Sequence, residues 1–428
     1  MSTYVKEYIE IATTTEERIQ EPDKSLCSNQ EYMVLDAIFH AHKAGGSKQA
    51  KQALKTAMRL VPAIARLLND SKDDYKPPIN DDGEEKHQPD DDEIAILLTD
   101  AWDKQFAFIY QEWRKYQNGC WVGISQAEIQ VRIRQFLRHF RRVGVRVTQS
   151  RIRQIRDMMQ DDLFISDEAI MQTAKYREGY LPMKNGLFNL KTLQLEPHTP
   201  DIYFINQLGF EYQPTATCPN WERFLSTSLT LPDDPNTPDK EMIMFVQEAL
   251  AYSMTAQTHL KASFWLYGKP NSGKSTLLSF IRDFMGEFHA TIDLNAMGNS
   301  RFGLTNIIGK HVVTFPEAEQ GAVINDAIYK AITGGGDQIE IDRKNRDPIN
   351  IIPVCKLWWG MNNAPRTTDR SGAMFDRLYP VLFNHTVPSE KRIYNLNELL
   401  MNERSGIFNW LIAGYRRLQS QGKFTACK

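Results

Sequence analysis

The sequence predicts an α/β fold built around a phosphate-binding loop, and three observations predict it. The apolar run "ASFWLY" (262–267) leads into "GKPNSGKS", and "STLLSFIRDFMG" (275–286) follows with apolar residues at helical spacing. Two more apolar runs, "VVTF" (312–315) and "CKLWWGM" (355–361), are followed closely by polar side chains. Helical patterns flank this region at 219–260 and in "ERSGIFNWLIAGYRRL" (403–418). Strands that alternate with helices indicate a sheet covered by helices.

The composition is that of an ordinary globular protein. The chain has 428 residues, 42% of them apolar and 24% charged, which is enough for two or three domains. No apolar run approaches the ~20 residues that cross a bilayer, and the first residues lack the pattern of a secretory signal. Five scattered cysteines without a CxxC pair argue against a disulfide framework or structural zinc. We therefore expect no membrane partner and a cytoplasmic protein, in a bacterial or host cell interior.

Composition and pattern divide the chain into six parts. Residues 71–92 have three prolines, many acids and almost nothing apolar, so they cannot bury enough surface to offset their ordering entropy. The expected parts are a helical N-terminal module of unknown role (1–70), an acidic flexible linker (71–93), a mixed α/β segment with arginine-rich helices (94–215), a helical linker (216–260), a nucleotide-binding core (261–385) and a C-terminal helical segment (386–428).

Charge is unevenly spread, although the net charge is only −2. Nine arginines lie between residues 132 and 156, on two predicted helices, and the second helix is opened by a Thr or Ser cap. Upstream, Asn118-Gly119 predicts the turn of a β-hairpin. The arginines could contact the phosphates of DNA, with salt-dependent affinity. Alternatively, they could contact another subunit or the acidic segment 80–93 folded back on them.

The segment Gly268-x-x-x-x-Gly273-Lys274-Ser275 satisfies the Walker A pattern. Backbone N–H groups at a helix N-terminus suit an anion, Lys274 would reach the β- and γ-phosphates, and Ser275 would bind Mg²⁺. The alternative is a glycine-rich structural turn. The predicted ligands are ATP and Mg²⁺, and the predicted nucleotide-binding residues are Gly268, Lys269, Pro270, Asn271, Ser272, Gly273, Lys274, Ser275 and Thr276.

Polar residues after the neighbouring strands are candidates for catalysis. Glu317 follows "VVTF" and could support the metal and polarise the attacking water, with Glu319 as a second candidate. Asn362 follows "CKLWWGM" and could orient that water or sense the γ-phosphate, whereas Asn363 fits a capping role in the turn before Pro365. The alternative is that these are solvated or turn-forming residues at strand ends.

Two further basic features follow from the pattern. Arg377, just before another strand, could act as an arginine finger for a neighbouring subunit. Arg370 competes for that role, and a structural ion pair is the alternative for either. The alternation in "QIEID" and "PINII" predicts a β-hairpin with a basic tip at Arg343, Lys344 and Arg346. Such a tip could contact a phosphate backbone, or be a solvated hairpin without a ligand.

This order of motifs resembles superfamily 3 helicases, specifically the poxvirus and phage or plasmid primase-helicase branch. Walker A "GKPNSGKS", "VVTFPEAE", "TGGGD", "MNNAP" and "DRL" follow one another within about 110 residues. "FIYQEWRKYQNGCW", "CPNWERFL" and "ERSGIFNWLIAGYRRL" also resemble that branch, so the likeness covers about 100 to 420.

The resemblance implies an AAA+-like ATPase core with mainly helical N-terminal and pre-helicase domains and a short helical C-terminal segment. It implies a hexameric ring of identical subunits that binds single-stranded and forked DNA during replication of a phage, plasmid or other mobile element. Lys274 and Ser275 would be the phosphate and metal residues, and Glu317 the Walker B acid. Lys344 would be the DNA contact of the hairpin, Asn362 the sensor, and Arg377 the finger in trans.

Two functions remain open at this point. The first is an ATP-dependent DNA helicase. The second is a replication initiator or scaffold whose assembly on DNA is switched by ATP, with little unwinding. A small-molecule kinase fits poorly, because no acceptor pocket or lid is evident. Residues 1–100 show no acidic and histidine constellation for nucleotidyl transfer, so we expect a separate primase or polymerase partner.

Overall fold

The computed structural model describes residues 89–141, 144–173, 179–292, 304–315, 325–344, 346–361 and 372–427, with a few isolated positions before residue 49. The chain divides into two compact units. Unit 1 holds residues 1–103 and 125–163, and unit 2 holds residues 104–124 and 164–428. None of the described helices is long and apolar enough to cross a membrane.

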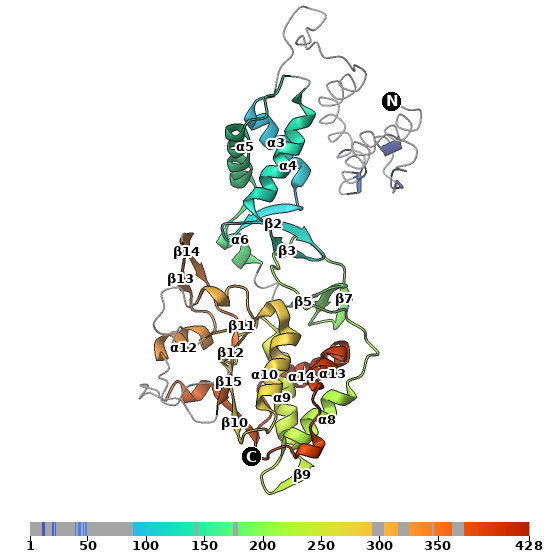
Figure 1. Ribbon diagram of the computed structural model, residues 1–428, viewed down its shortest axis with the longest axis vertical. Coiled ribbons are helices and arrows are strands. Elements are labelled where there is room, and N and C mark those ends of the chain that lie inside the picture. Colours follow the sequence, from blue (N-terminus) through green and yellow to red (C-terminus); the bar gives the residue numbers. More distant parts are fainter. Residues whose placement is uncertain are drawn as a thin grey trace, which may run out of the picture. The chain divides into compact units, whose positions relative to one another are not determined.

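The described part of unit 1 is a bundle of three helices, α3 (Asp91–Trp102), α4 (Gln126–His139) and α5 (Gln149–Asp162) (Figure 1). Helix α5 packs against both α3 and α4. Apolar residues at helical spacing form the interior: Ile94, Ala95, Leu98, Ile129, Ile133, Leu137, Ile152, Ile155 and Met159. The predicted cap of α5 is confirmed, because Thr148 Oγ1 accepts a hydrogen bond from Arg151 N at 3.2 Å.

Helix α3 begins inside the segment that the sequence predicted to be an acidic linker. Asp90 caps the helix and forms a capping box with Glu93, with distances of 2.8 and 3.1 Å. Acidic side chains in a first turn are stabilised by the helix dipole, so the same acids that suggested a linker favour a helix start.

Unit 2 opens with small sheets, antiparallel except for the parallel pair β1 and β4, and with short helices. The predicted turn is confirmed: Asn118 and Gly119 have φ of +51° and +87°, and they join β2 to β3. The elements before the central sheet are β1 (Phe106–Ile109), β2 (Glu112–Gln117), β3 (Cys120–Gly123), β4 (Phe164–Ile165), α6 (Asp167–Gln172), β5 (Tyr180–Met183), β6 (Gly186–Asn189), β7 (Gln194–Glu196), α8 (Pro219–Ser228), β8 (Thr230–Leu231), β9 (Asp234–Pro238) and α9 (Lys240–Met254).

The centre of unit 2 is a five-stranded sheet in the order β11-β12-β15-β10-β16, with every neighbouring pair parallel. The predicted α/β class is therefore confirmed, and the structure adds that the central sheet is parallel. The remaining elements are β10 (Ser263–Gly268), α10 (Lys274–Met285), η3 (Gly286–Phe288), β11 (His289–Thr291), η4 (Thr305–Ile307), β12 (Val312–Phe315), α12 (Asp326–Thr333), β13 (Ile339–Arg343), β14 (Arg346–Ile351), β15 (Lys356–Met361), η5 (Phe375–Arg377), β16 (Leu378–Phe383), η6 (Ser389–Lys391), α13 (Leu396–Asn402) and α14 (Arg404–Gln421).

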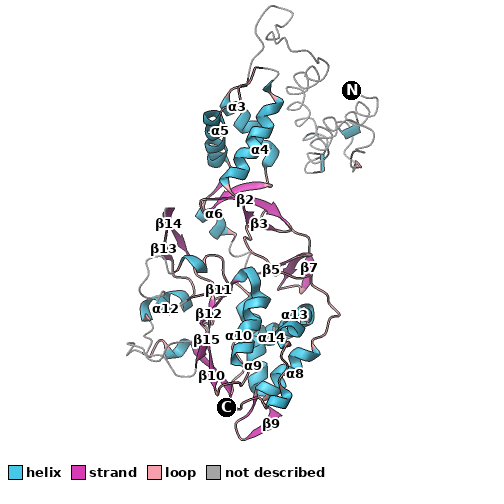
Figure 2. Ribbon diagram, in the orientation of Figure 1, coloured by secondary structure: helices cyan, strands magenta, loops and turns pink. Residues whose placement is uncertain are grey.

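Both faces of this sheet are buried, which explains why its strands read as continuous apolar runs. Phe264 and Trp358 lie on one face in a core shared with α8, α9, α10 and α14. Trp265 and Trp359 lie on the other face, in a core shared with α12 and the β13–β14 hairpin. Figure 2 shows the strands between these helical layers.

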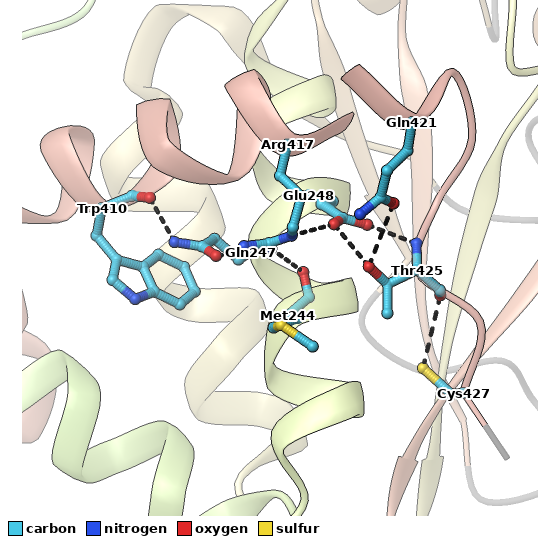
Figure 3. A network of polar contacts seen from close by, with 8 residues as sticks. All are labelled: Met244, Gln247, Glu248, Trp410, Arg417, Gln421, Thr425 and Cys427. Carbon is cyan, nitrogen blue, oxygen red and sulfur yellow. Dashed lines mark hydrogen bonds and ion pairs between the residues drawn. The ribbon is translucent and has the colours of Figure 1, made fainter. Parts of the chain in front are cut away.

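A buried polar network joins α9 to α14 and to the segment after it (Figure 3). Glu248 of α9 is fully buried, and it pairs with Arg417 of α14. It also accepts hydrogen bonds from Thr425 N at 2.6 Å and Thr425 Oγ1 at 2.7 Å. Gln247 Nε2 donates to Trp410 O at 2.6 Å. The C-terminal segment is thereby attached to the helical layer behind β10.

Candidate nucleotide site

The phosphate loop lies between the carboxyl end of β10 and the start of α10, at residues 268–274. Gly273 has φ +108° and directly precedes the helix, so the turn uses backbone that residues with a Cβ rarely adopt. Gly268 has φ +154°, and a Cβ there would lie 2.1 Å from Phe383 O of β16. The two glycines of the motif are therefore required by the shape of the loop.

The ammonium group of Lys274 lies inside this loop. Only 8% of the side chain is exposed, and Nζ donates to Gly268 O at 2.6 Å and to Lys269 O at 2.7 Å. Burial lowers the pKa of Lys274 from its ordinary value. A phosphate oxygen in the loop would compete with two neutral carbonyls for this cation, and a charged acceptor forms the stronger hydrogen bond.

The start of α10 offers donors for an anion. No side chain caps this helix, so its first N–H groups are open to a ligand. Ser272 in the same loop is 1% exposed, and its Oγ has no hydrogen-bond partner within the described structure. Ser275, in the first turn of α10, is exposed. Uncapped amides, a buried cation and an unpaired hydroxyl together fit a phosphate chain.

Two segments far away in the sequence hold the loop from behind. Thr386 Oγ1 donates to Pro270 O at 3.0 Å, and Val387 N donates to Asn271 O at 3.0 Å. At the end of α8, Ser228 Oγ lies 2.7 Å from the position that a Cβ on Gly273 would take. No local pattern in the sequence points to these contacts, and we did not predict them.

The candidate catalytic residues follow strands that end at the same edge of the sheet as the phosphate loop. Tyr267, the last residue before Gly268, is level with Met361 of β15. Phe315, the end of β12, is level with Trp359. Asn362 follows β15 directly, and Glu317 follows β12 by two positions. Glu317, Glu319, Asn362, Asn363 and Arg370 all lie outside the described residues, so their roles stay predictions.

Arg377 lies at the opposite end of the strands from the phosphate loop. It directly precedes β16, whose first residue, Leu378, is level with Ser263 at the start of β10. The length of β16 separates this end from the loop by roughly 16 Å, at ~3.3 Å per residue. Arg377 Nη1 donates to Ala373 O, whereas its buried Nε has no partner in the described parts of the chain. Within one chain, Arg377 is therefore remote from the phosphate loop.

The β13–β14 hairpin forms as predicted, but its tip differs from the prediction. Lys344 is exposed at the turn, while the side chain of Arg346 is outside the described structure. Arg343, predicted as part of the exposed tip, is only 8% exposed, and Nη1 donates to Tyr110 O at 2.7 Å. The alternation Ile339, Ile341, Arg343 already places Arg343 on the buried face of the strand, and this signal could have revealed the burial.

Donors for a metal ion are sparse in what the structure describes. No three His, Cys, Asp or Glu side chains within the described ranges gather closely enough to hold a cation. Of the two predicted Mg²⁺ ligands, Ser275 is described and is exposed beside Lys274. A hydroxyl with nucleotide phosphates and waters suits Mg²⁺, which usually keeps several waters and few protein ligands.

Two stretches of the chain match known families, each over less than half of its length. Residues 95–229 match the family described as D5 N terminal like. Residues 266–377, which include the whole phosphate loop and strands β11, β12 and β15, match a family of unknown function, DUF5906.

Similarity to individual proteins is low but extensive. The chain is 22% identical over 258 residues to the Sputnik virophage protein named "Putative helicase V13". The aligned region covers 54% of this chain and 31% of that protein. The chain thus spans about a third of the length of this curated relative. Two apo structures of the NrS-1 C-terminal region are 15% and 12% identical. They cover 77% and 80% of this chain and 71% and 76% of theirs, with TM-scores of 0.46 and 0.49. The chain is therefore similar to a viral protein named as a helicase.

Proposed function

We propose that this protein is an ATP-dependent DNA helicase with an AAA+-like core, which forms a ring and translocates on single-stranded DNA during replication of a phage, plasmid or other mobile element. The observation that carries the proposal is the uncapped start of α10 with the buried Lys274, at the edge where β10, β12 and β15 end. Ligands of open α/β sheets bind outside the carboxyl ends of strands, which is this edge. The similarity to a helicase-named viral protein and to the D5 N terminal like family supports the class of reaction.

The chain's own residues would bind and orient the triphosphate. On binding, Lys274 exchanges the carbonyls of Gly268 and Lys269 for β- and γ-phosphate oxygens, and the amides of the loop hold the remaining oxygens. Ser275 and Glu317 would hold Mg²⁺, which supplies neutralisation of the charge that develops on the phosphates. Glu317 would accept a proton from the attacking water, and Asn362 would orient that water.

The position of Arg377 supports the proposed assembly. An arginine at the far edge of the sheet cannot reach the loop of its own chain, but it can reach that of a neighbour in a head-to-tail ring. A guanidinium supplied in this way stabilises charge in the transition state of phosphoryl transfer. We therefore propose a closed ring, with six subunits as in the helicases that the sequence resembles.

Coupling to DNA would use the hairpin. Ile341, Ile349 and Ile351 are buried in the core that contains Trp359, so the base of the hairpin is joined to the central sheet. Thr305 Oγ1 also donates to Asp342 O at 3.1 Å. With Arg343 bound to Tyr110, the exposed Lys344 is the described basic group of the turn that can contact a phosphate.

Replacing Lys274 by alanine tests the proposal. The loss of the phosphate-binding cation should abolish ATP hydrolysis and the unwinding of a forked DNA, because the change removes contacts that strengthen in the transition state. Lys423→Ala, which removes an exposed lysine near the C-terminus, is the control and should keep both activities. Unwinding by the Lys274→Ala variant at the parent rate would contradict the proposal.

The burial of Arg343 leaves fewer basic groups on the hairpin and favours a second candidate, an ATP-switched initiator or scaffold with little unwinding. Glu317→Gln separates the two. In a helicase, the variant should bind ATP but fail to turn over or unwind. In an initiator, ATP-dependent DNA binding should persist in this variant, and the parent protein itself should unwind little.

A further inference from the structure

The two ends of the three-helix bundle in unit 1 differ in charge. Helices α3 and α5 run in the same direction: Arg151 pairs with Asp91 where both helices begin, and Thr99 Oγ1 contacts Asp162 at 3.4 Å near their other ends. Helix α4 runs in the opposite direction, because only a short connection, 140–148, joins it to α5. One end of the bundle therefore combines the C-terminus of α4 with the N-termini of α3 and α5.

Four exposed arginines gather at this end, and we call them the arginine end: Arg138, Arg141, Arg146 and Arg153. Among the described residues, none of the four has an ion pair or a hydrogen bond from its side chain. By contrast, Arg132 pairs with Glu128 at 2.9 Å, and Arg156 pairs with Asp157. The opposite end of the bundle carries acids instead, at Asp100, Asp103, Asp161 and Asp162.

Three of the four acidic residues at 90–93 are used locally, whereas Asp92 is exposed in the first turn of α3. Asp90 and Glu93 form the capping box of α3, and Asp91 pairs with Arg151, which also donates to Pro89 O at 2.9 Å. The alternative that the acidic segment folds back on the arginine-rich helices therefore holds for Arg151. Among the described residues 89–93 of that segment, no such contact reaches the arginine end, where the four guanidinium groups repel one another.

The fold does not require these arginines. The interior of α4 is made by Ile129, Ile133 and Leu137, and Arg138 and Arg141 lie outside it. Residues 89–103 and 125–163, which form the three-helix bundle, contain no lysine, so their basic side chains are planar guanidinium groups and His139. Guanidinium is the side-chain group that matches phosphate with paired N–H donors.

We propose that the arginine end binds the sugar-phosphate backbone of DNA, as a contact separate from the nucleotide site and from Lys344. The choice of DNA as the polyanion rests on the proposed function. That this surface binds a polyanion follows from its charge and exposure alone. Contacts to phosphates carry no sequence information, so the surface binds DNA of any sequence, with affinity that falls steeply with salt.

The test measures binding of the full-length protein to labelled oligodeoxythymidylate, without ATP, over a series of KCl concentrations. In the variant with Arg138→Gln, Arg141→Gln, Arg146→Gln and Arg153→Gln, the slope of log K against log [KCl] should become shallower by about 3, at ~0.7 per lost single-strand phosphate contact. The DNA-free ATPase rate and the thermal midpoint should not change. An unchanged slope would overturn the proposal.

A matched pair of double variants controls for total charge. Arg138→Gln with Arg141→Gln should lower the slope by about 1.4, whereas Arg132→Gln with Arg156→Gln, which removes the paired arginines, should change it little. Equal effects of the two pairs would mean a diffuse charge effect and overturn the proposal. The proposal would also be overturned if the arginine-end substitutions weakened binding of polyglutamate but left DNA binding unaltered. If the parent lacks ATPase and unwinding but its DNA binding depends on these arginines, the proposed function fails and this inference stands.

Discussion

At the residue scale, Gly268 ends β10, opens the phosphate loop and packs closely against β16. Its φ is +154°, and an added Cβ would lie only 2.1 Å from Phe383 O, so there is no room for a side chain. We therefore expect Gly268→Ala to displace β16 or the loop, at a cost of about 3 kcal/mol or more in folding free energy. Thermal unfolding should show a midpoint several degrees below that of the parent protein.

Gly422→Ala is the matched control for that change. Gly422 also has positive φ, +68°, but an added Cβ there meets no atom within 4 Å. The control should cost only the backbone strain, about 1 kcal/mol. If the two variants melt at the same temperature, the close approach of Gly268 to Phe383 is not what makes glycine necessary.

Residues whose environment is set by neighbours in the sequence were predicted well. The sequence predicts a Thr or Ser cap for α5, and Thr148 is that cap, since its hydroxyl accepts from an amide three positions on. Asn118 and Gly119 were recognised as a turn because both need positive φ. The Walker A glycines belong to the same class, since the shape of the loop is a local property.

Residues whose environment is set by distant parts of the chain were not predicted. The hydrogen bond from Arg343 to Tyr110 joins strand β13 to the turn after β1. No sequence pattern near either residue predicts this contact. Thr386 and Val387 likewise support the phosphate loop from beyond β16. Such contacts depend on the packing of whole elements, which the sequence pattern alone does not specify.

At the scale of elements, the error at the start of α3 has a definite cause. Acids at 90–93 continue the low-complexity run of acids before them, although Asp90 and Glu93 have the spacing of a capping box. Their negative charge also suits a helix N-terminus. The strands were easier, because apolar runs such as "SFWLY" and "VVTF" reflect burial on both faces of the sheet.

The contact between α9 and α14 makes a prediction about stability. Arg417→Met should remove the main positive partner of the fully buried Glu248, and a buried charge left unpaired costs about 3–5 kcal/mol. Arg416→Met is the matched control, because this neighbouring arginine is exposed and should change stability by about 0.5 kcal/mol or less. Thermal unfolding of the two variants measures the difference.

A second variant distinguishes the lost charge pair from lost packing. Adding Glu248→Gln to Arg417→Met removes the unpaired charge and should restore part of the stability, since the amide can still accept from Thr425. A double variant that is as unstable as the sum of the single changes would mean that Glu248 and Arg417 do not act as a pair.

At the scale of the whole molecule, the order of the sheet separates the two groups that phosphoryl transfer would need. Strand β10 ends at the phosphate loop. Its parallel neighbour β16 begins directly after Arg377, at the opposite end of the strands. A single chain therefore holds the phosphate loop and Arg377 at opposite ends of these strands. In a head-to-tail ring, each seam between subunits can combine one of each.

Mixing two inactive variants tests this arrangement. Lys274→Ala lacks a working loop and Arg377→Ala lacks the finger, so each alone should have little ATPase activity. In a random equal mixture, about a quarter of the seams should combine the intact loop of one variant with the intact finger of the other, and recover about a quarter of the parent rate.

The control replaces the Arg377→Ala protein by the variant carrying both changes, which leaves no intact loop in any subunit and should recover nothing. Native mass spectrometry can establish that the subunits exchange. If mixed rings form and no activity returns, Arg377 does not act on a neighbouring subunit, and the head-to-tail ring loses the feature of this chain that argues for it.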